Sequence, residues 1–116
     1  SRGLGDVYKR QEYIHANLAE TISIDTLAQI THLSKSYFMG QFKKAAGVGA
    51  IEYINQLRIK RACHLLTDTA KSVAEIAFAC GFRNLSNFNR QFRGYVSCTP
   101  GEYRRITEGM KAAASG

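Results

Sequence analysis

The stretch LAQITHLSKSYFMGQFKK (residues 27–44) returns in altered form as IAFACGFRNLSNFNRQFR (residues 76–93). Its early positions match at a separation of 49 residues and its later positions at a separation of 50. The matched pairs are Ala28 with Ala77, Leu33 with Phe82, Phe38 with Phe88, and Phe42 with Phe92. The second copy therefore carries one extra residue between two spacings that are otherwise kept. Insertions are best tolerated in turns, so each copy is predicted to be a short helix, a tight turn and a second helix.

This layout is that of a helix-turn-helix, in which the second helix enters the major groove of DNA. Gly81 stands where the sharp turn favours a positive φ, and His32 occupies the matching place in the first copy. Histidine tolerates the left-handed region better than most residues, so both turns are feasible. The N-caps expected for the second helices are Ser34 in the first copy and Asn84 or Ser86 in the second.

The charge balance agrees with a nucleic-acid partner. The 116-residue chain has 16 Lys and Arg against 9 Asp and Glu, a formal net charge of +7. A basic surface attracts phosphate, although charge alone describes a merely soluble basic domain equally well. No apolar run approaches the roughly 18 residues that a membrane span needs, and nothing at the start of the sequence resembles a signal peptide. The expected compartment is the cytoplasm.

The three cysteines do not predict a chemical site. Cys63, Cys80 and Cys98 stand 17 and 18 residues apart, without a C-x-x-C pair or a clustered histidine. Two of them lie in apolar helical contexts and are interpreted as small buried hydrophobic residues. The three together predict neither a zinc site nor a disulfide framework. Paired carboxylates and a phosphate-binding loop are also missing from the sequence. We therefore expect no metal, no cofactor and no catalysis.

Residues 1–11 (SRGLGDVYKRQ) differ in composition from the rest of the chain, with two glycines and no helical apolar period. They resemble the translation of a sequencing adapter and are treated as non-native. The domain is expected to begin near residue 12, within a first helix whose start is missing.

The remaining sequence predicts an all-α fold of about seven helices. The long helix at 50–66 repeats apolar residues at helical spacing: Ile51, Ile54, Leu57, Ala62, Leu65 and Leu66. Ser72 and Glu75 form an expected capping box, and Pro100 suits the first position of a last helix. The predicted segments are a remnant at 12–18, a helix capped by Ser23, helices at 34–46, 50–66, 72–80 and 85–95, a last helix after Thr99, and a frayed tail at 109–116.

Several of these segments together carry a family resemblance. YINQLRIKRACHLL, SVAEIAFACGF, the F-x-x-x-F of Phe88 and Phe92, and TPGEYRR follow one another in order. The chain resembles the C-terminal DNA-binding domain of AraC/XylS-type transcription regulators. The resemblance implies two helix-turn-helix subdomains, at 12–47 and 72–108, joined by the helix at 50–66 and reading two successive major grooves of double-stranded DNA. It also implies an effector-binding or dimerisation domain, absent from this fragment, and allows RNA polymerase as a second partner.

The expected DNA contacts follow from helical geometry and from the resemblance. At about 100° per residue, Phe38, Phe42 and Ala45 point inward in the first reading helix, as do Phe88, Phe92 and Tyr95 in the second. The positions that the resemblance assigns to DNA are Ser36, Met39, Gly40, Ser86, Asn87, Asn89 and Arg90. Arg90 can bond guanine through two donors and Asn87 can pair similarly with adenine. The side chains expected on phosphates are Lys43, Lys44 and Arg93.

Two positions depart from the usual pattern of this family. Gly40 stands where an arginine is frequent; a mid-helix glycine costs up to about 1 kcal/mol relative to alanine and offers no base contact. Ser97 stands where a glycine is common, before the last helix. Readout by the first unit is therefore expected to be weaker, or to rest on Ser36, Met39 and close approach of the backbone.

Two other classes of protein are alternatives. Similar domains occur fused to DNA-repair alkyltransferases, but no cysteine here lies in an electropositive setting with a partner histidine. A helical protein-interaction module would favour a polar or acidic outer face on the helix at 85–95. Ser86, Asn87, Arg90 and Arg93 argue against that alternative.

Overall fold

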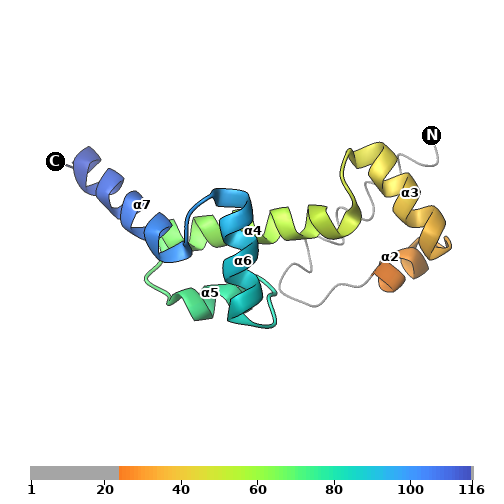
Figure 1. Cartoon of the computed structure of the whole chain (residues 1–116), viewed down its shortest axis with the longest axis horizontal. Helices are drawn as coiled ribbons and strands as arrows, with labels where there is room; N and C mark the ends of the chain where they lie inside the picture. Colours follow the sequence, from red (N-terminus) through yellow and green to blue (C-terminus); the bar gives the residue numbers. More distant parts are fainter. Residues whose placement is uncertain (1–23, 116) are drawn as a thin grey trace. The chain divides into compact units, whose positions relative to one another are not determined.

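The computed structural model describes residues 24–115. Within that range the regular elements are six α-helices (Figure 1). They are α2 (Ile24–Ile30), α3 (Lys35–Ala46), α4 (Ala50–Asp68), α5 (Val73–Ala79), α6 (Leu85–Val96) and α7 (Pro100–Ser115). The expected all-α fold is confirmed. The predictions for residues 1–11, for the segment 12–18 and for Ser23 lie outside the described residues.

The chain divides into two compact units, the first ending at Leu57 and the second beginning at Arg58. Each unit has its own apolar core. The first core consists of Leu27, Ala28, Phe38, Phe42, Ala50 and Ile54. The second consists of Ile59, Ala62, Leu66, Ile76, Ala77, Cys80, Phe82, Phe88 and Phe92. Helix α4 supplies residues to both cores, so the connecting helix is a structural part of each unit.

The turns of the two helix-turn-helix copies close in the same way. In each, the backbone N–H of the large apolar residue after the turn donates to the carbonyl of the small alanine, Leu33 to Ala28 at 3.1 Å and Phe82 to Ala77 at 3.0 Å. His32 and Gly81 have positive φ angles of 59° and 95°, as the sequence predicted.

The reading helices are capped by short polar side chains. Ser34 Oγ accepts from the Tyr37 N–H at 3.3 Å, and Asn84 Oδ1 accepts from the Asn87 N–H at 2.7 Å. Asn84 is therefore the second cap, and the alternative Ser86 was wrong. The N-cap oxygen accepts a hydrogen bond from a helix N–H that would otherwise lack a partner. It therefore fixes where each of the two helices begins.

The internal repeat extends further than the sequence comparison indicated. The ring centroids of Phe38 and Phe42 lie 5.8 Å apart, and Phe42 packs edge-on against Tyr53 with a centroid distance of 5.5 Å. In the second unit Phe88 and Phe92 lie 5.7 Å apart, and Phe92 meets Tyr103 edge-on at 5.7 Å. The start of α7 thus repeats the start of α4, and the repeated element is a set of three helices.

Three side chains assigned to apolar faces are exposed. Ala45 and Tyr95 were expected in the cores, but both are exposed, and Ala46 and Val96 pack there instead. A side chain four residues after the second phenylalanine, such as Ala46 or Val96, points within about 40° of it around the helix axis. A side chain three residues after it, such as Ala45 or Tyr95, points about 60° away. Ile51 is 57% exposed, because the core-facing side of α4 starts at Ala50.

The expected frayed tail at 109–116 was also wrong, since α7 continues to Ser115. Its alanine-rich end favours a helix, and Lys111 ties it to α4 through an ion pair with Asp68 at 3.7 Å. Thr99 and Glu102 start α7 with a capping box, like the confirmed Ser72–Glu75 box of α5. Hydrogen bonds to the backbone of Thr99 and to its hydroxyl lower the pKa of the Glu102 carboxyl.

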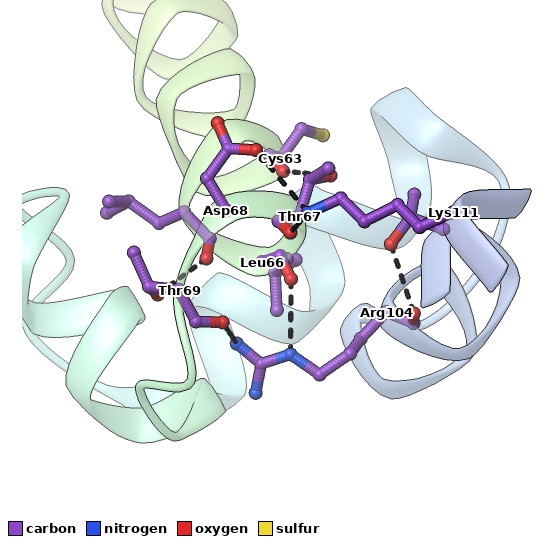
Figure 2. Close-up of polar contacts among 9 residues, drawn as sticks. Cys63, Leu66, Thr67, Asp68, Thr69, Arg104 and Lys111 are labelled. Carbon is purple, nitrogen blue, oxygen red and sulfur yellow. Dashed lines mark hydrogen bonds and ion pairs between the residues drawn. The ribbon is translucent and has the colours of Figure 1, made fainter. Parts of the chain in front are cut away.

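Side chains from α7 cap the C-terminal end of α4 (Figure 2). Arg104 Nε donates to the Leu66 carbonyl and Arg104 Nη2 to the Thr69 carbonyl, both at 3.2 Å, and Lys111 donates to the Thr67 carbonyl. Helix α4 has no basic residue in its own last turn. The two cations therefore satisfy orphaned carbonyls and oppose the negative end of the helix dipole.

The left-handed residues after α3 and α6 allow a paired stability test. Gly47 has φ 84° and the equivalent Ser97 has φ 70°, a conformation that costs a residue with a Cβ roughly 1–2 kcal/mol. Ser97→Gly should raise the free energy of unfolding by about 0.5–1 kcal/mol and Tm by about 2–8 °C. Gly47→Ser should lower both, although a Cβ there meets nothing within 4 Å. Thermal unfolding measures the effects of both substitutions. A lower Tm in Ser97→Gly would contradict the idea that Ser97 is strained in its left-handed conformation.

The cap on α4 predicts different effects for two neighbouring arginines. Arg104→Met keeps the aliphatic stem but leaves two carbonyls without their donor, so it should cost about 1–3 kcal/mol. Arg105→Met removes the same charge from an exposed side chain and should stay within about 0.5 kcal/mol of wild type. Urea unfolding compares the two, and equal destabilisation would argue against the capping role.

Candidate nucleic-acid interface

The outward face of α3 is formed by the residues that the sequence proposed for DNA contact. Because Phe38 and Phe42 are fully buried, they fix the opposite side of the helix as the solvent side. All five proposed positions on this helix are exposed: Ser36, Met39, Gly40, Lys43 and Lys44. Gly40 lies in the middle of this face, and a Cβ there would meet nothing within 4 Å. The first reading helix is therefore flat at its centre and cationic in its last turn.

Helix α6 presents the same geometry with different chemistry. Phe88 and Phe92 are fully buried, so the face opposite them is open. Ser86, Asn89, Arg90 and Arg93 are exposed, and Asn87 is partly buried. Where α3 has Gly40, α6 carries a guanidinium group.

The structure joins two of the proposed α6 side chains. Arg90 Nη2 donates a hydrogen bond to Asn87 Oδ1 at 2.7 Å. The Asn87 backbone N–H is in turn held by the Asn84 side chain at 2.7 Å. The polar groups of the first turns of α6 are therefore connected to each other.

A hollow of about 470 Å³ lies beside the C-terminal half of α3. Its lining combines three of the proposed contact residues with the turn into α4: Met39, Gly40, Lys43, Gly47, Val48, Gly49, Ala50 and Glu52. Three glycines in this lining leave the backbone accessible. An approaching polyanion would meet the Lys43 ammonium group there, with the Glu52 carboxylate as a nearby repulsive charge.

Tyr37 is a surface residue that the sequence reasoning missed. It is 56% exposed and stands at the position of α3 that corresponds to Asn87 in α6, since the two are 50 residues apart. The separation of the F-x-x-x-F pairs would have located it. A tyrosine in place of an asparagine gives the first unit an aromatic edge where the second unit has an amide.

The thiols of Cys63 and Cys80 are poorly suited to act as nucleophiles. Burial raises the pKa of the Cys80 thiol to about 11, and partial burial also raises the pKa of Cys63. Cys80 is a fully buried core residue, as the sequence predicted. Within residues 24–115 no three metal-ligating side chains lie together, and no helix there is long and apolar enough to cross a bilayer.

Comparisons with known proteins agree on one family. A family model described as a helix-turn-helix domain matches residues 27–106. The melibiose operon regulatory protein of Escherichia coli K12 is 33% identical over 96 residues, which cover 83% of this chain and 32% of that protein. The chain thus spans about a third of the length of this relative.

Solved structures give the same result. A transcriptional regulator from Chromobacterium violaceum, described as containing an AraC-type DNA-binding domain, is 30% identical with a TM-score of 0.81. The match covers 89% of this chain and 92% of that one. The DNA-binding domain of AdpA, solved with a target DNA, has a TM-score of 0.88 at 24% identity and covers 91% and 96% of the two chains. At that identity the likeness concerns the fold.

Proposed function

Because the chain belongs to the AraC-type family of helix-turn-helix transcription regulators, we propose that the outward faces of α3 and α6 are its DNA-reading surfaces. The single observation that carries this proposal is the repeated geometry of the two helices. Each begins at a polar cap, rests on two buried phenylalanines and ends at a left-handed residue. Each therefore presents the same side of a rigid helix, as insertion into a major groove requires.

The proposed contacts differ in kind along these faces. Arg90 supplies paired donors for the O6 and N7 atoms of guanine. Lys43, Lys44 and Arg93 are proposed to hold phosphates, which provide affinity without sequence preference. The proposed groups near base edges are Ser36 and Met39 on α3, with the bare backbone at Gly40, and Ser86, Asn87 and Asn89 on α6.

For the longer regulator that such a domain serves, we propose control of transcription in the bacterial cytoplasm. Since the chain spans about a third of the melibiose operon regulatory protein, an effector-binding or dimerisation domain and contact with RNA polymerase belong to this proposal. We propose no catalytic role for the domain. The raised pKa values of Cys63 and Cys80 support that view, because alkyl transfer needs a thiolate.

DNA binding should be monomeric and steeply dependent on salt, because one chain carries both reading helices and several cations. Neutralising Lys43 and Lys44 together (Lys43→Gln, Lys44→Gln) should reduce the slope of log K against log salt by about 0.9 for each phosphate that is no longer neutralised. Lys60→Gln with Lys71→Gln removes equal charge outside the proposed surface and should keep the slope. Fluorescence anisotropy over a salt series measures this. Absence of duplex binding at every salt concentration would refute the proposed function.

The two reading helices should differ in specificity. Arg90→Ala should cost about 1–3 kcal/mol of binding and relax the preference at one base pair. Gly40→Arg places a guanidinium on the equivalent position of α3, where a side chain has open space, and should add a preference in the other half-site. Selection from random duplexes with wild type, both variants and the charge-matched Arg105→Ala compares them. Equal sequence preference in the two half-sites selected by wild type would contradict the different roles proposed for α3 and α6.

A further inference from the structure

In the first turns of α6, hydrogen bonds link Asn84 to Asn87 and Asn87 to Arg90. Asn84, Asn87 and Arg90 follow one another at intervals of three residues, which places them on neighbouring positions of the helix surface. The side-chain Oδ1 of Asn84 accepts from the Asn87 backbone N–H, and the side-chain Oδ1 of Asn87 accepts from Arg90 Nη2, both at 2.7 Å. The helix cap and the proposed guanine reader are thus connected through one asparagine.

This bond changes what Asn87 can offer to a base. Pairing with adenine requires both halves of the side-chain amide, the oxygen to accept from N6 and the nitrogen to donate to N7. In the structure the Asn87 oxygen already accepts from a cationic donor. Hydrogen bonds with one ionised partner are stronger than neutral ones, so the lone pair that accepts from Arg90 is held firmly and an adenine amino group has only the second lone pair of this oxygen.

The same bond leaves Arg90 well equipped. A guanidinium group carries five N–H donors in a rigid plane, so one bond to Asn87 leaves enough donors for guanine O6 and N7. Binding normally requires a long exposed side chain to give up rotamer freedom. A guanidinium held against its own helix has already lost part of that freedom, and its plane is set before DNA arrives.

We propose that Asn87 is a positioning residue that holds the Arg90 guanidinium for one guanine, and that it does not read a base itself. The inference rests on the proposed function of α6. It makes Asn87 and Arg90 a single reader of one G·C pair. Helix α3 has no such pair at the equivalent positions, because they hold Tyr37 and Gly40.

The test is a double-mutant cycle on binding specificity, using the full chain and its selected duplex. Wild type, Asn87→Ala, Arg90→Ala and the double variant are titrated with the selected site and with each single base-pair substitution. Asn87→Ala should lower discrimination at the pair read by Arg90 by roughly 3- to 10-fold, the effect of freeing one flexible side chain. In the Arg90→Ala background it should change nothing further.

Two companion variants separate positioning from other effects. Asn87→Asp keeps an acceptor for Arg90, so it should retain the guanine preference although its charge weakens overall affinity. Tyr37→Ala alters the equivalent position of α3 and should leave discrimination at that pair unchanged. Circular dichroism should show the same helix content throughout. The inference would be overturned if Asn87→Ala lowered discrimination at a different base pair and if, in the double variant, its effect multiplied with that of Arg90→Ala.

Modified bases test the contact atom by atom. Replacing the guanine by 7-deazaguanine removes the N7 acceptor and should weaken wild type more than Asn87→Ala, whereas hypoxanthine keeps O6 and N7 and should be neutral. An equal loss in the two proteins would contradict positioning. If wild type binds no duplex, the proposed function fails. If it binds and Asn87 acts independently of Arg90, only this inference fails.

Discussion

Helices α3 and α6 each carry two phenylalanines one turn apart on the buried face. The remaining structure depends on the burial of these two pairs. Phe38 and Phe42 in α3, and Phe88 and Phe92 in α6, are completely buried. Removing such a side chain from water is worth about 1.5–3 kcal/mol, more than a substitution at an ordinary surface position usually changes. The pair therefore decides the rotation of the helix, and positions 40 and 90 face outward as a consequence.

This division explains why the two copies agree inside and differ outside. Burial follows nearly the same order from residue 34 to 50 as from 84 to 100, because changes of volume in a close-packed core are costly. The exposed positions carry no such constraint. On α6 they hold amides and a guanidinium, whereas on α3 the corresponding places hold Tyr37, Met39 and Gly40. One scaffold thus carries two outer surfaces of different chemistry.

Features set by local chemistry could be predicted from the sequence. The positive φ angles at His32 and Gly81 and the cap at Ser34 depend on a few neighbouring residues. Features set by tertiary contact could not. Helix α7 continues beyond its expected end at residue 108. This is partly because Lys111 donates a hydrogen bond to the carbonyl of Thr67, 44 residues earlier in the chain. The Asn87–Arg90 bond depends on a choice of rotamers that no spacing specifies. The proposed DNA contacts remain predictions, because only their exposure follows from the structure.

The third helix of the repeat shows how one element was adapted to two tasks. Ile54 in α4 and Arg104 in α7 are equivalent positions 50 residues apart. Ile54 is a core residue of the first unit, and α4 continues beyond it to give Ile59, Ala62 and Leu66 to the second core. Arg104 instead turns toward the end of α4 and donates to the carbonyls of Leu66, in its last turn, and of Thr69, just beyond it. An apolar side chain at 104 could not satisfy those carbonyls. The long α4 that serves both cores therefore depends on its own shorter counterpart for its C-terminal cap.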